Sequence, residues 1–178
     1  MKQKFLNVIP ECYVDTNLIE YLMSAGVNHQ HSCTKVVGLL NNQFKDKFAI
    51  GIIDKDKVQV GYIRECVEIA ATEHLTLMKH RIRHQFLITV SPAADGFILD
   101  ISSDEGIDTR EYGLPSDLKE FTKVSKAVTS NTDDRFRNLF KAVRNNREFR
   151  NLRLALDYMV KHTYKTDLEE LVRLFTAP

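Results

Sequence analysis

Phe48-Ala49-Ile50-Gly51-Ile52-Ile53-Asp54-Lys55-Asp56-Lys57 is the stretch that decides the fold. Its first six residues are apolar or small, and four charged residues follow them without a transition. A short run that is apolar at every position, instead of at alternate positions, predicts a strand buried on both faces. Strands of this kind belong to parallel sheets that are covered by helices on both sides.

The residues before this strand alternate between strand and helix patterns. Residues 5–9 are a shorter apolar run that stops at Pro10, and we expect a second buried strand there. Helical spacing of apolar residues follows over 15–23 and again after Thr34, with a short polar segment over 27–33 between them. This order of elements predicts an α/β protein with a parallel sheet core flanked by helices.

The rest of the chain predicts an extension of the sheet followed by helices. Residues 62–71 fit a short helix, and apolar, β-rich runs over 75–78, 85–90 and 96–101 are expected to extend the sheet. From Ser116 onward the apolar residues recur at helical spacing. A Gly-Leu-Pro turn at 113–115 marks the change. We therefore expect an α/β core with a β extension over residues 1–113 and a helical subdomain packed on it over 114–178.

The composition excludes several classes of protein. The 178 residues include 25 Lys and Arg against 24 Asp and Glu, so a simple polyanion binder is not expected. No apolar run approaches the roughly 20 residues that cross a bilayer, and no signal-peptide pattern is seen. The cysteines are odd in number and form no CxxC pair, which predicts reduced thiols in a cytoplasmic protein without membrane partners.

Carboxylates follow both apolar strands of the first third. Glu11 comes directly after the first strand, and Asp54 and Asp56 come directly after the second. The carboxyl ends of the strands are where ligands bind in an open parallel sheet, so neighbouring strands would bring these acids together. Such like charges repel one another, and a bound divalent cation relieves the repulsion. Oxygen ligands predict Mg²⁺ or Mn²⁺ at this edge instead of zinc.

These residues also carry a resemblance to a known family. Glu11-Cys-Tyr-Val-Asp15, a helix and then Ile52-Ile53-Asp54-Lys55-Asp56 resembles the Toprim (topoisomerase–primase) domain. The family pattern is an apolar strand with Glu-Gly-x-x-Asp, a helix, and a later apolar strand with Asp-x-Asp. The resemblance covers about residues 4–60. It implies that Glu11 is an acid–base carboxylate or metal ligand, and that Asp54 and Asp56 hold Mg²⁺.

The same resemblance implies a function and two further site residues. Asp15 would support the metal site, and Asp95 would be an additional acid. The small-nuclease and OLD-type branches of the family imply a nuclease acting on DNA or RNA, in phage defence or a mobile element. Cys12 stands where the family has Gly, which favours one alternative: a catalytically inactive Toprim-like module that binds a protein partner.

A second resemblance uses some of the same residues. Tyr13-Val14-Asp15-Thr16-Asn17 resembles the opening of PIN-domain ribonucleases, in which an apolar strand ends in Asp-Thr-Asn. It implies a first strand over 12–14, Asp15 as the lead metal ligand, and later acids supplied by Glu65 or Glu68. Both resemblances place Asp15 in an acidic metal site.

Basic residues gather in a different part of the chain. The window 135–153 holds seven Lys and Arg residues against one acid. Arg137, Lys141 and Arg144 fall on one face of an expected helix, opposite its apolar face, and are candidates for binding a nucleic-acid backbone. Lys55 and Lys57, beside the acids, are further candidates. The alternative is that this face is only the solvated back of a packed helix.

Two histidine-rich segments allow more than one interpretation. His29, His31 and Cys33 alternate, so they are zinc-capable ligands on one side of a strand, or a polar loop without metal. Residues 74–84 mix three His with Lys and Arg, which indicates either a phosphate-binding patch or a solvated hairpin.

Overall fold

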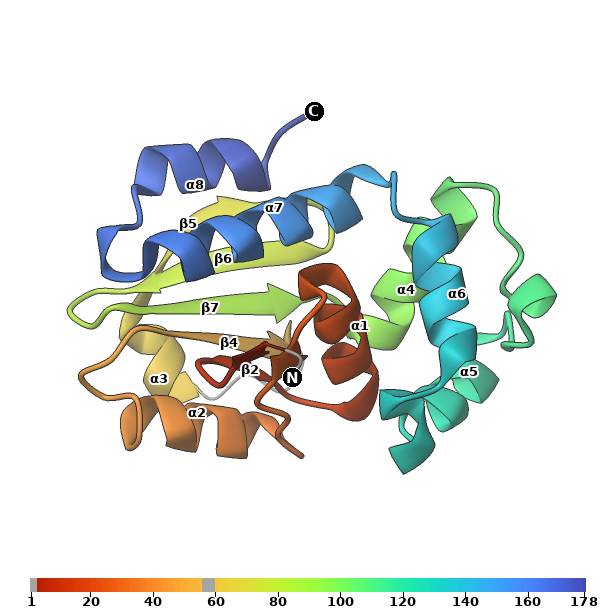
Figure 1. Cartoon of the computed structure of the whole chain (residues 1–178), viewed down its shortest axis with the longest axis horizontal. Helices are drawn as coiled ribbons and strands as arrows, with labels where there is room; N and C mark the ends of the chain where they lie inside the picture. The colour runs from red at the N-terminus through yellow and green to blue at the C-terminus, as the bar shows by residue number, and fades with distance from the viewer. Residues whose placement is uncertain (1–2, 56–59) are drawn as a thin grey trace.

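A five-stranded sheet forms the centre of the protein (Figure 1). The computed structural model describes residues 3–55 and 60–178. The strand order is β2-β4-β7-β6-β5. The first three strands are parallel, whereas β6 and β5 are antiparallel to their neighbours. The predicted α/β class, with a parallel-rich sheet flanked by helices, is confirmed. The strands are β2 (Val8–Pro10), β4 (Ala49–Asp54), β5 (Cys66–Ala71), β6 (Leu75–His80) and β7 (Gln85–Val90).

Helices cover both faces of the sheet because the strand side chains alternate between two apolar clusters. Val8, Ile50 and Ile52 point to the face covered by α1, α7 and α8. Ile9 and Ile53 point to the opposite face, beneath α2 and α3. Every residue of β4 is buried, as the uninterrupted apolar run predicts. These helices are α1 (Tyr13–Met23), α2 (Cys33–Asn41), α3 (Val60–Arg64), α7 (Arg147–His162) and α8 (Leu168–Phe175).

The expected first strand over 5–9 is divided into two pieces. β1 (Lys4–Phe5) pairs with β3 (Gly26–Val27) in a separate small sheet, and β2 begins at Val8. The chain after β3 then runs beside β2, because the backbone N–H of Asn28 donates to the carbonyl of Val8 at 2.9 Å and that of Gln30 to Pro10 at 3.0 Å. Residues 28–30 therefore lie next to the carboxyl end of β2.

Two of the expected elements in the middle of the chain are wrong. Residues 96–101 are not a strand but part of α4 (Ala94–Asp104). Phe97 and Ile98 precede Ile101 by four and three residues, so a helix buries all three on one side. The expected helix over 62–71 ends at Arg64, and residues 66–71 form β5 because they pair with β6.

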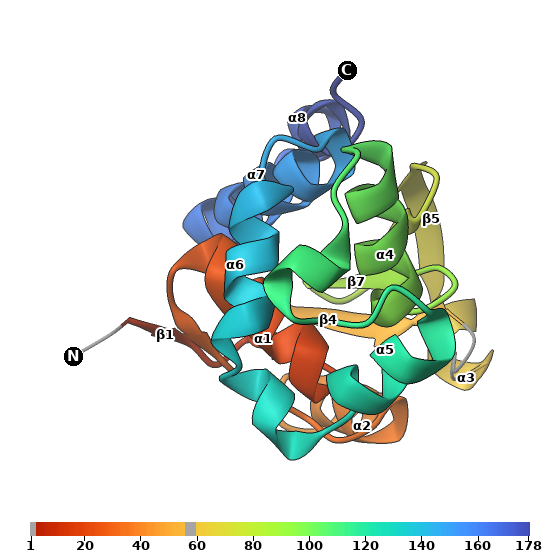
Figure 2. The same cartoon turned by 90° about the vertical axis from the view of Figure 1, so that its right-hand side faces the viewer.

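The C-terminal part is helical, as expected. Its further helices are α5 (Leu118–Ser125) and α6 (Asp134–Ala142), with short 3₁₀ turns over Thr109–Tyr112 (η2), Val128–Asn131 (η3) and Thr163–Lys165 (η4). Figure 2 shows α4, α5 and α6 in front of the end of the sheet at which β4 and β7 terminate. One apolar cluster joins the sheet to α6, α7 and α8. The division into residues 1–113 and 114–178 stays a prediction. None of the helices in the described ranges is both long and apolar enough to cross a membrane.

Gly51 lies where α2 packs closest to β4. A Cβ at this position would lie 3.0 Å from methyl carbons of both Leu40 and Leu87, and 3.1 Å from one of Val36. All three neighbours are fully buried, so they have little room to move. Glycine therefore sets the spacing between this helix and the sheet.

We expect Gly51→Ala to destabilise the protein by about 1–3 kcal/mol, because the added methyl overpacks the core. Gly38→Ala is the matched control: it lies on α2 with no atom within 4 Å of its would-be Cβ. Replacing this helical glycine should stabilise by about 0.5–1 kcal/mol. Urea unfolding measures both changes, and a Gly51→Ala protein as stable as Gly38→Ala would contradict the prediction.

Candidate functional site

The pairing of β2 with β4 brings Glu11 and Asp54 together at the carboxyl edge of the sheet. Pro10 lies opposite Ile52, so Glu11, directly after β2, lies beside the end of β4, whose last residue is Asp54. The backbone N–H of Asp54 donates to Oε2 of Glu11 at 3.2 Å. Both side chains are buried, with 3% and 4% of their surface exposed.

Asp15 adds a third carboxylate from the first turn of α1. The helix begins at Tyr13, and the backbone N–H of Cys12 donates to Oδ2 of Asp15 at 3.2 Å. The other oxygen, Oδ1, is buried and accepts no hydrogen bond from any part of the chain that the structure describes. An unpaired buried acceptor is costly, so this atom marks a place where a proton or cation would be stabilising.

The three carboxylates influence one another electrostatically. Burial, the charge of Asp54 and the charge of Glu11 together raise the pKa of Asp15 to about 8, although the hydrogen bonds from Cys12 oppose the change. Burial and the charge of Asp15 also raise the pKa of the Cys12 thiol. The raised pKa disfavours the thiolate form that a cysteine nucleophile needs.

The amino end of α4 completes this edge. Oδ1 of Asp54 accepts the backbone N–H of Ala94 at 3.1 Å and so caps a helix whose own N-cap, Ala93, offers no side-chain acceptor. Asp95 follows in the first turn, is 7% exposed, and accepts a hydrogen bond from the Thr122 hydroxyl of α5. The sequence does not predict that the backbone N–H of Ala94 binds Asp54, because residues 96–101 resemble a strand and conceal the start of a helix at Ala94.

The structure brings some of the predicted site residues together and leaves others apart or undescribed. Glu11, Asp15 and Asp54 lie at one edge, with Asp95 in the adjoining helical turn. Asp56 and Lys57 lie outside the described residues, and Lys55 is exposed directly after β4. Glu11, Asp15 and Asp54 offer the carboxylate oxygens that Mg²⁺ and Mn²⁺ prefer. In residues 3–55 and 60–178, however, no three His, Cys, Asp or Glu side chains are already arranged to hold one metal ion.

The predicted zinc-capable trio is not formed. Cys33 is buried at the start of α2, in the cluster on the far face of the sheet. His29 Nδ1 instead lies 2.7 Å from the Thr16 hydroxyl, and its ring stacks on Tyr13 with centroids 4.6 Å apart. His31 contacts both rings. Burial and the neighbouring His31 lower the pKa of His29. Tyr13, His29 and His31 therefore form an aromatic cluster beside the amino end of α1.

The strand required by the PIN resemblance is also not formed. Tyr13 and Val14 belong to the first turn of α1. Glu68 lies on β5, at the opposite edge of the sheet from β2, and Glu65 directly precedes that strand. The strand order therefore keeps both acids away from Asp15.

Arg137 is not free to bind a nucleic-acid backbone. Its Nε donates to Asn17 Oδ1 at 2.9 Å, and its guanidinium lies 3.6 Å from Glu20. These contacts join α6 to α1 and compensate the buried amide of Asn17. Lys141 and Arg144 are exposed and remain candidates. The predicted basic face is therefore only partly available.

In the mixed His and basic segment over 74–84, two of the three histidines are buried, whereas Arg81 and His84 are exposed. His74 is buried, with Nδ1 2.5 Å from Glu148 and Nε2 3.3 Å from Asp100. His80 is also buried, pairs with Glu65 at 3.1 Å and accepts two backbone N–H groups through Nδ1. Both histidines are structural links between elements.

Comparison of the chain with protein-family models, with curated proteins and with solved structures found no match. The candidate site is therefore defined by the geometry of this chain alone, and the Toprim resemblance stays a prediction from sequence.

We expect Asp15→Asn to stabilise the protein at neutral and alkaline pH. The pKa of Asp15 rises from 3.8 to about 8 on folding, so the folded state binds this proton more tightly and loses stability as pH rises across that interval. Asn keeps an acceptor for Cys12 but carries no charge. Each tenfold change in the ionisation equilibrium corresponds to ~1.4 kcal/mol, or about 3–6 °C in Tm for a chain of this size.

The measurement is thermal unfolding of both proteins from about pH 5 to about pH 8 without divalent cations. The advantage of Asp15→Asn should grow with pH. Asp46→Asn, which removes an exposed carboxylate, should show no such trend. An Asp15→Asn protein that is less stable than wild type at the alkaline end would contradict the prediction.

His74 should also make stability depend on pH, over an interval that begins at its ordinary pKa of 6.5. Burial opposes its charge, but hydrogen bonds and charges from Glu148 and Asp100 outweigh burial and raise its pKa; its partner Glu148 has a lowered pKa. The contribution of His74 is present below its ordinary pKa and is lost as pH rises through the raised value. The Thr72 hydroxyl and the backbone N–H of His74 also donate to Glu148, so the carboxylate keeps these two partners when the imidazole is removed.

His74→Gln should therefore cost about 1.5–3 kcal/mol at mildly acidic pH, the range for hydrogen bonds to charged groups, and less at alkaline pH. Unfolding free energies of wild type and variant at about pH 6 and about pH 9 measure the difference. His84→Gln, at an exposed position, is the control and should show no pH trend. A constant gap for His74→Gln would exclude this role.

Proposed function

We propose that the protein is a nuclease whose carboxylate edge binds Mg²⁺ or Mn²⁺ and that it cleaves phosphodiester bonds of DNA or RNA. The observation that supports this most is the crowding of three buried carboxylates, Glu11, Asp15 and Asp54, at the carboxyl ends of two neighbouring parallel strands. This is the edge at which ligands bind in sheets of this type. A cation would offset the repulsion that raises the pKa of Asp15.

Each residue has a role in this proposal. Glu11 and Asp54 would be the first oxygen ligands, with Asp15 beside them and Asp56 as a further ligand from the segment outside the described residues. When bound, the cation supplies charge stabilisation at the phosphate and lowers the pKa of a water molecule. The exposed side chains of Lys55, Lys141 and Arg144 would contact the nucleic-acid backbone.

One observation favours a second candidate, an inactive module that binds a protein partner. Glu11 already accepts the N–H of Asp54, and Asp54 already caps α4. These carboxylates therefore have structural partners without a cation. In addition, Cys12 presents a side chain at the turn before α1, where the Toprim pattern has Gly.

A divalent-cation titration tests the site. Mn²⁺ should raise the Tm of the wild-type protein, because binding adds RT ln(1 + [L]/Kd) to the free energy of unfolding. This gain is about 2.7 kcal/mol at a hundredfold excess over Kd. Glu11→Gln and Asp54→Asn should abolish the shift, because each removes a charged oxygen ligand. Glu68→Gln, an exposed carboxyl on β5, should retain it. No Mn²⁺-dependent shift in the wild type would exclude the metal site.

Cleavage assays then separate the two candidates. Single- and double-stranded DNA and RNA should be cleaved with Mg²⁺ or Mn²⁺ by the wild type and by Glu68→Gln, and not by Glu11→Gln. Cation binding without cleavage of any substrate would favour the inactive module.

A further inference from the structure

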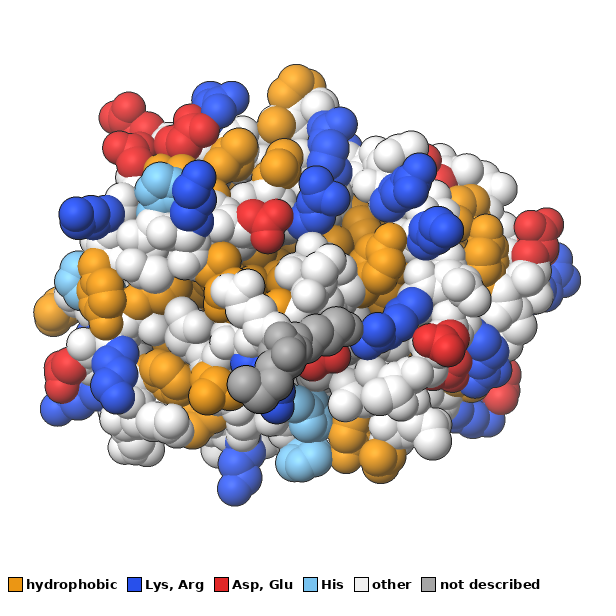
Figure 3. Space-filling model, viewed as in Figure 1, with side chains coloured by type: hydrophobic (Ala, Val, Ile, Leu, Met, Phe, Trp, Pro, Cys, Tyr) orange, Lys and Arg blue, Asp and Glu red, His pale blue; other side chains and the backbone are white. Residues whose placement is uncertain are grey.

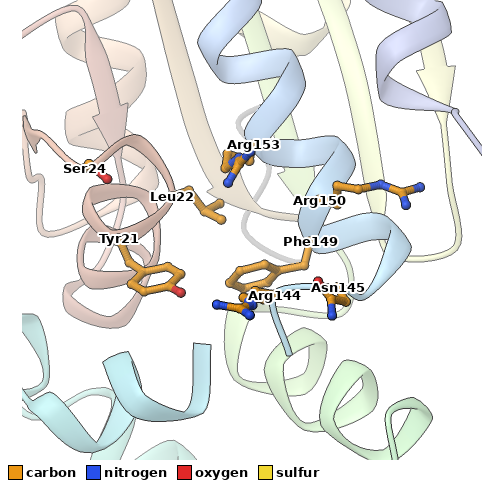
Figure 4. Close-up of a pocket in the computed structure, with 8 residues that line it drawn as sticks. All are labelled: Tyr21, Leu22, Ser24, Arg144, Asn145, Phe149, Arg150 and Arg153. Carbon is orange, nitrogen blue, oxygen red and sulfur yellow. The ribbon is translucent and has the colours of Figure 1, made fainter. Parts of the chain in front are cut away.

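A cavity of about 570 Å³ lies between the end of α1 and the first half of α7. Its walls come from the last turn of α1, the connection between α6 and α7, and the exposed side of α7 (Figure 4). Lys and Arg side chains gather over this junction of α6 and α7 on the surface shown in Figure 3. The lining residues are Tyr21, Leu22, Ser24, Arg144, Asn145, Phe149, Arg150 and Arg153.

The charge in this cavity is of one sign. Three arginines line it, and none of its described lining residues is acidic. The two acids nearest in sequence are engaged elsewhere, since Glu20 pairs with Arg137 and Glu148 is buried against His74. The cavity therefore presents a net positive charge, which an anion would neutralise.

The three arginines are not equivalent. Arg150 donates to the carbonyl of Pro178 at 2.6 Å, and its guanidinium points away from Tyr21 and Leu22 in Figure 4. Arg144 forms no ion pair or side-chain hydrogen bond with the part of the chain that is described. Arg153 has one acidic neighbour, Asp157, one turn further along α7. Arg144 and Arg153 are therefore the cations available to a ligand.

The chemistry of the walls identifies a class of ligand. A guanidinium is planar and offers paired N–H donors that match two oxygens of a phosphate. The half-buried ring of Tyr21 adds an aromatic wall beside the arginines, and the buried ring of Phe149 supports it from behind, with the two centroids 6.1 Å apart. A volume of about 570 Å³ lies within the range of small-molecule sites and exceeds what one phosphate needs.

We propose that this cavity binds a nucleotide, with its phosphate held by Arg144 and Arg153 and its base against the aromatic wall. The nucleotide is either free or the 5′-phosphorylated end of a single strand, since both present the same groups. Binding here needs no divalent cation because none of the acids at the carboxylate edge lines the cavity. The inference therefore does not depend on the metal site, but it shares Arg144 with the nucleic-acid contacts of the proposed nuclease.

Isothermal titration calorimetry in EDTA tests the proposal on the full chain. The probes are AMP, adenosine, and a short oligothymidylate with and without a 5′-phosphate. AMP and the phosphorylated strand should bind at least about tenfold more tightly than adenosine and the unphosphorylated strand, because charged hydrogen bonds to phosphate are lost in the latter. Tighter binding of AMP would assign a free nucleotide, and tighter binding of the strand would assign a strand end.

Three variants locate the binding. Arg144→Gln combined with Arg153→Gln should weaken AMP binding at least about tenfold. Arg173→Gln is the matched control, because it removes an exposed arginine that pairs with Glu170 on α8. Asp54→Asn should bind AMP as the wild type does, which separates this site from the metal site. Thermal unfolding confirms that each variant is folded.

Two results would overturn the proposal. One is the absence of binding by either phosphorylated probe at about 1 mM, the weak end of specific affinity. The other is unchanged affinity in the folded double variant.

Discussion

The parallel pairing of β2 with β4 is the constraint on which the core and the candidate site both depend. Its register sets Val8 opposite Ile50 and Pro10 opposite Ile52. Because both faces of these strands are buried, a slip of one residue would exchange the side chains that face α1 with those that face α2. Gly51 fixes the distance to α2 at the same place. The position of Glu11 beside Asp54 follows from this register, so the site cannot shift without disturbing the core.

Burying three carboxylates at that edge is costly, and the structure compensates part of the cost without a cation. Backbone N–H groups donate to all three carboxylates: Asp54 to Glu11, Cys12 to Asp15, and Ala94 to Asp54. Two of these donors stand at the amino ends of α1 and α4, where the helix dipole also favours negative charge. The compensation is incomplete, since one oxygen of Asp15 has no described partner. This buried oxygen without a hydrogen-bond donor distinguishes the edge from an ordinary pair of capped helices.

The sequence predicts elements whose signal is local and misses contacts that are distant in the chain. β4 and α8 are predicted because one apolar run and one helical repeat define them. α4 is missed because its apolar residues satisfy both strand and helix patterns over so short a run. The role of Arg137 depends on Asn17, 120 residues away, and that of His74 on Glu148, 74 residues away. No local pattern carries such information, so charged and histidine residues appear as surface patches until the fold pairs them.

The two charged features of the molecule lie at opposite ends of α1, which spans about 16 Å over its 11 residues. Asp15 lies in its first turn, whereas Tyr21, Leu22 and Ser24 at its other end face the arginines. A helix dipole alone favours acids at the amino end and bases at the carboxyl end. That effect does not account for this arrangement, because the arginines belong to α7 and to the segment before it, and because Glu11 and Asp54 come from strands. Separate elements therefore supply each cluster of charge. The net charge of +1 hides this separation, since the acidic edge and the basic cavity cancel in the sum but not in space.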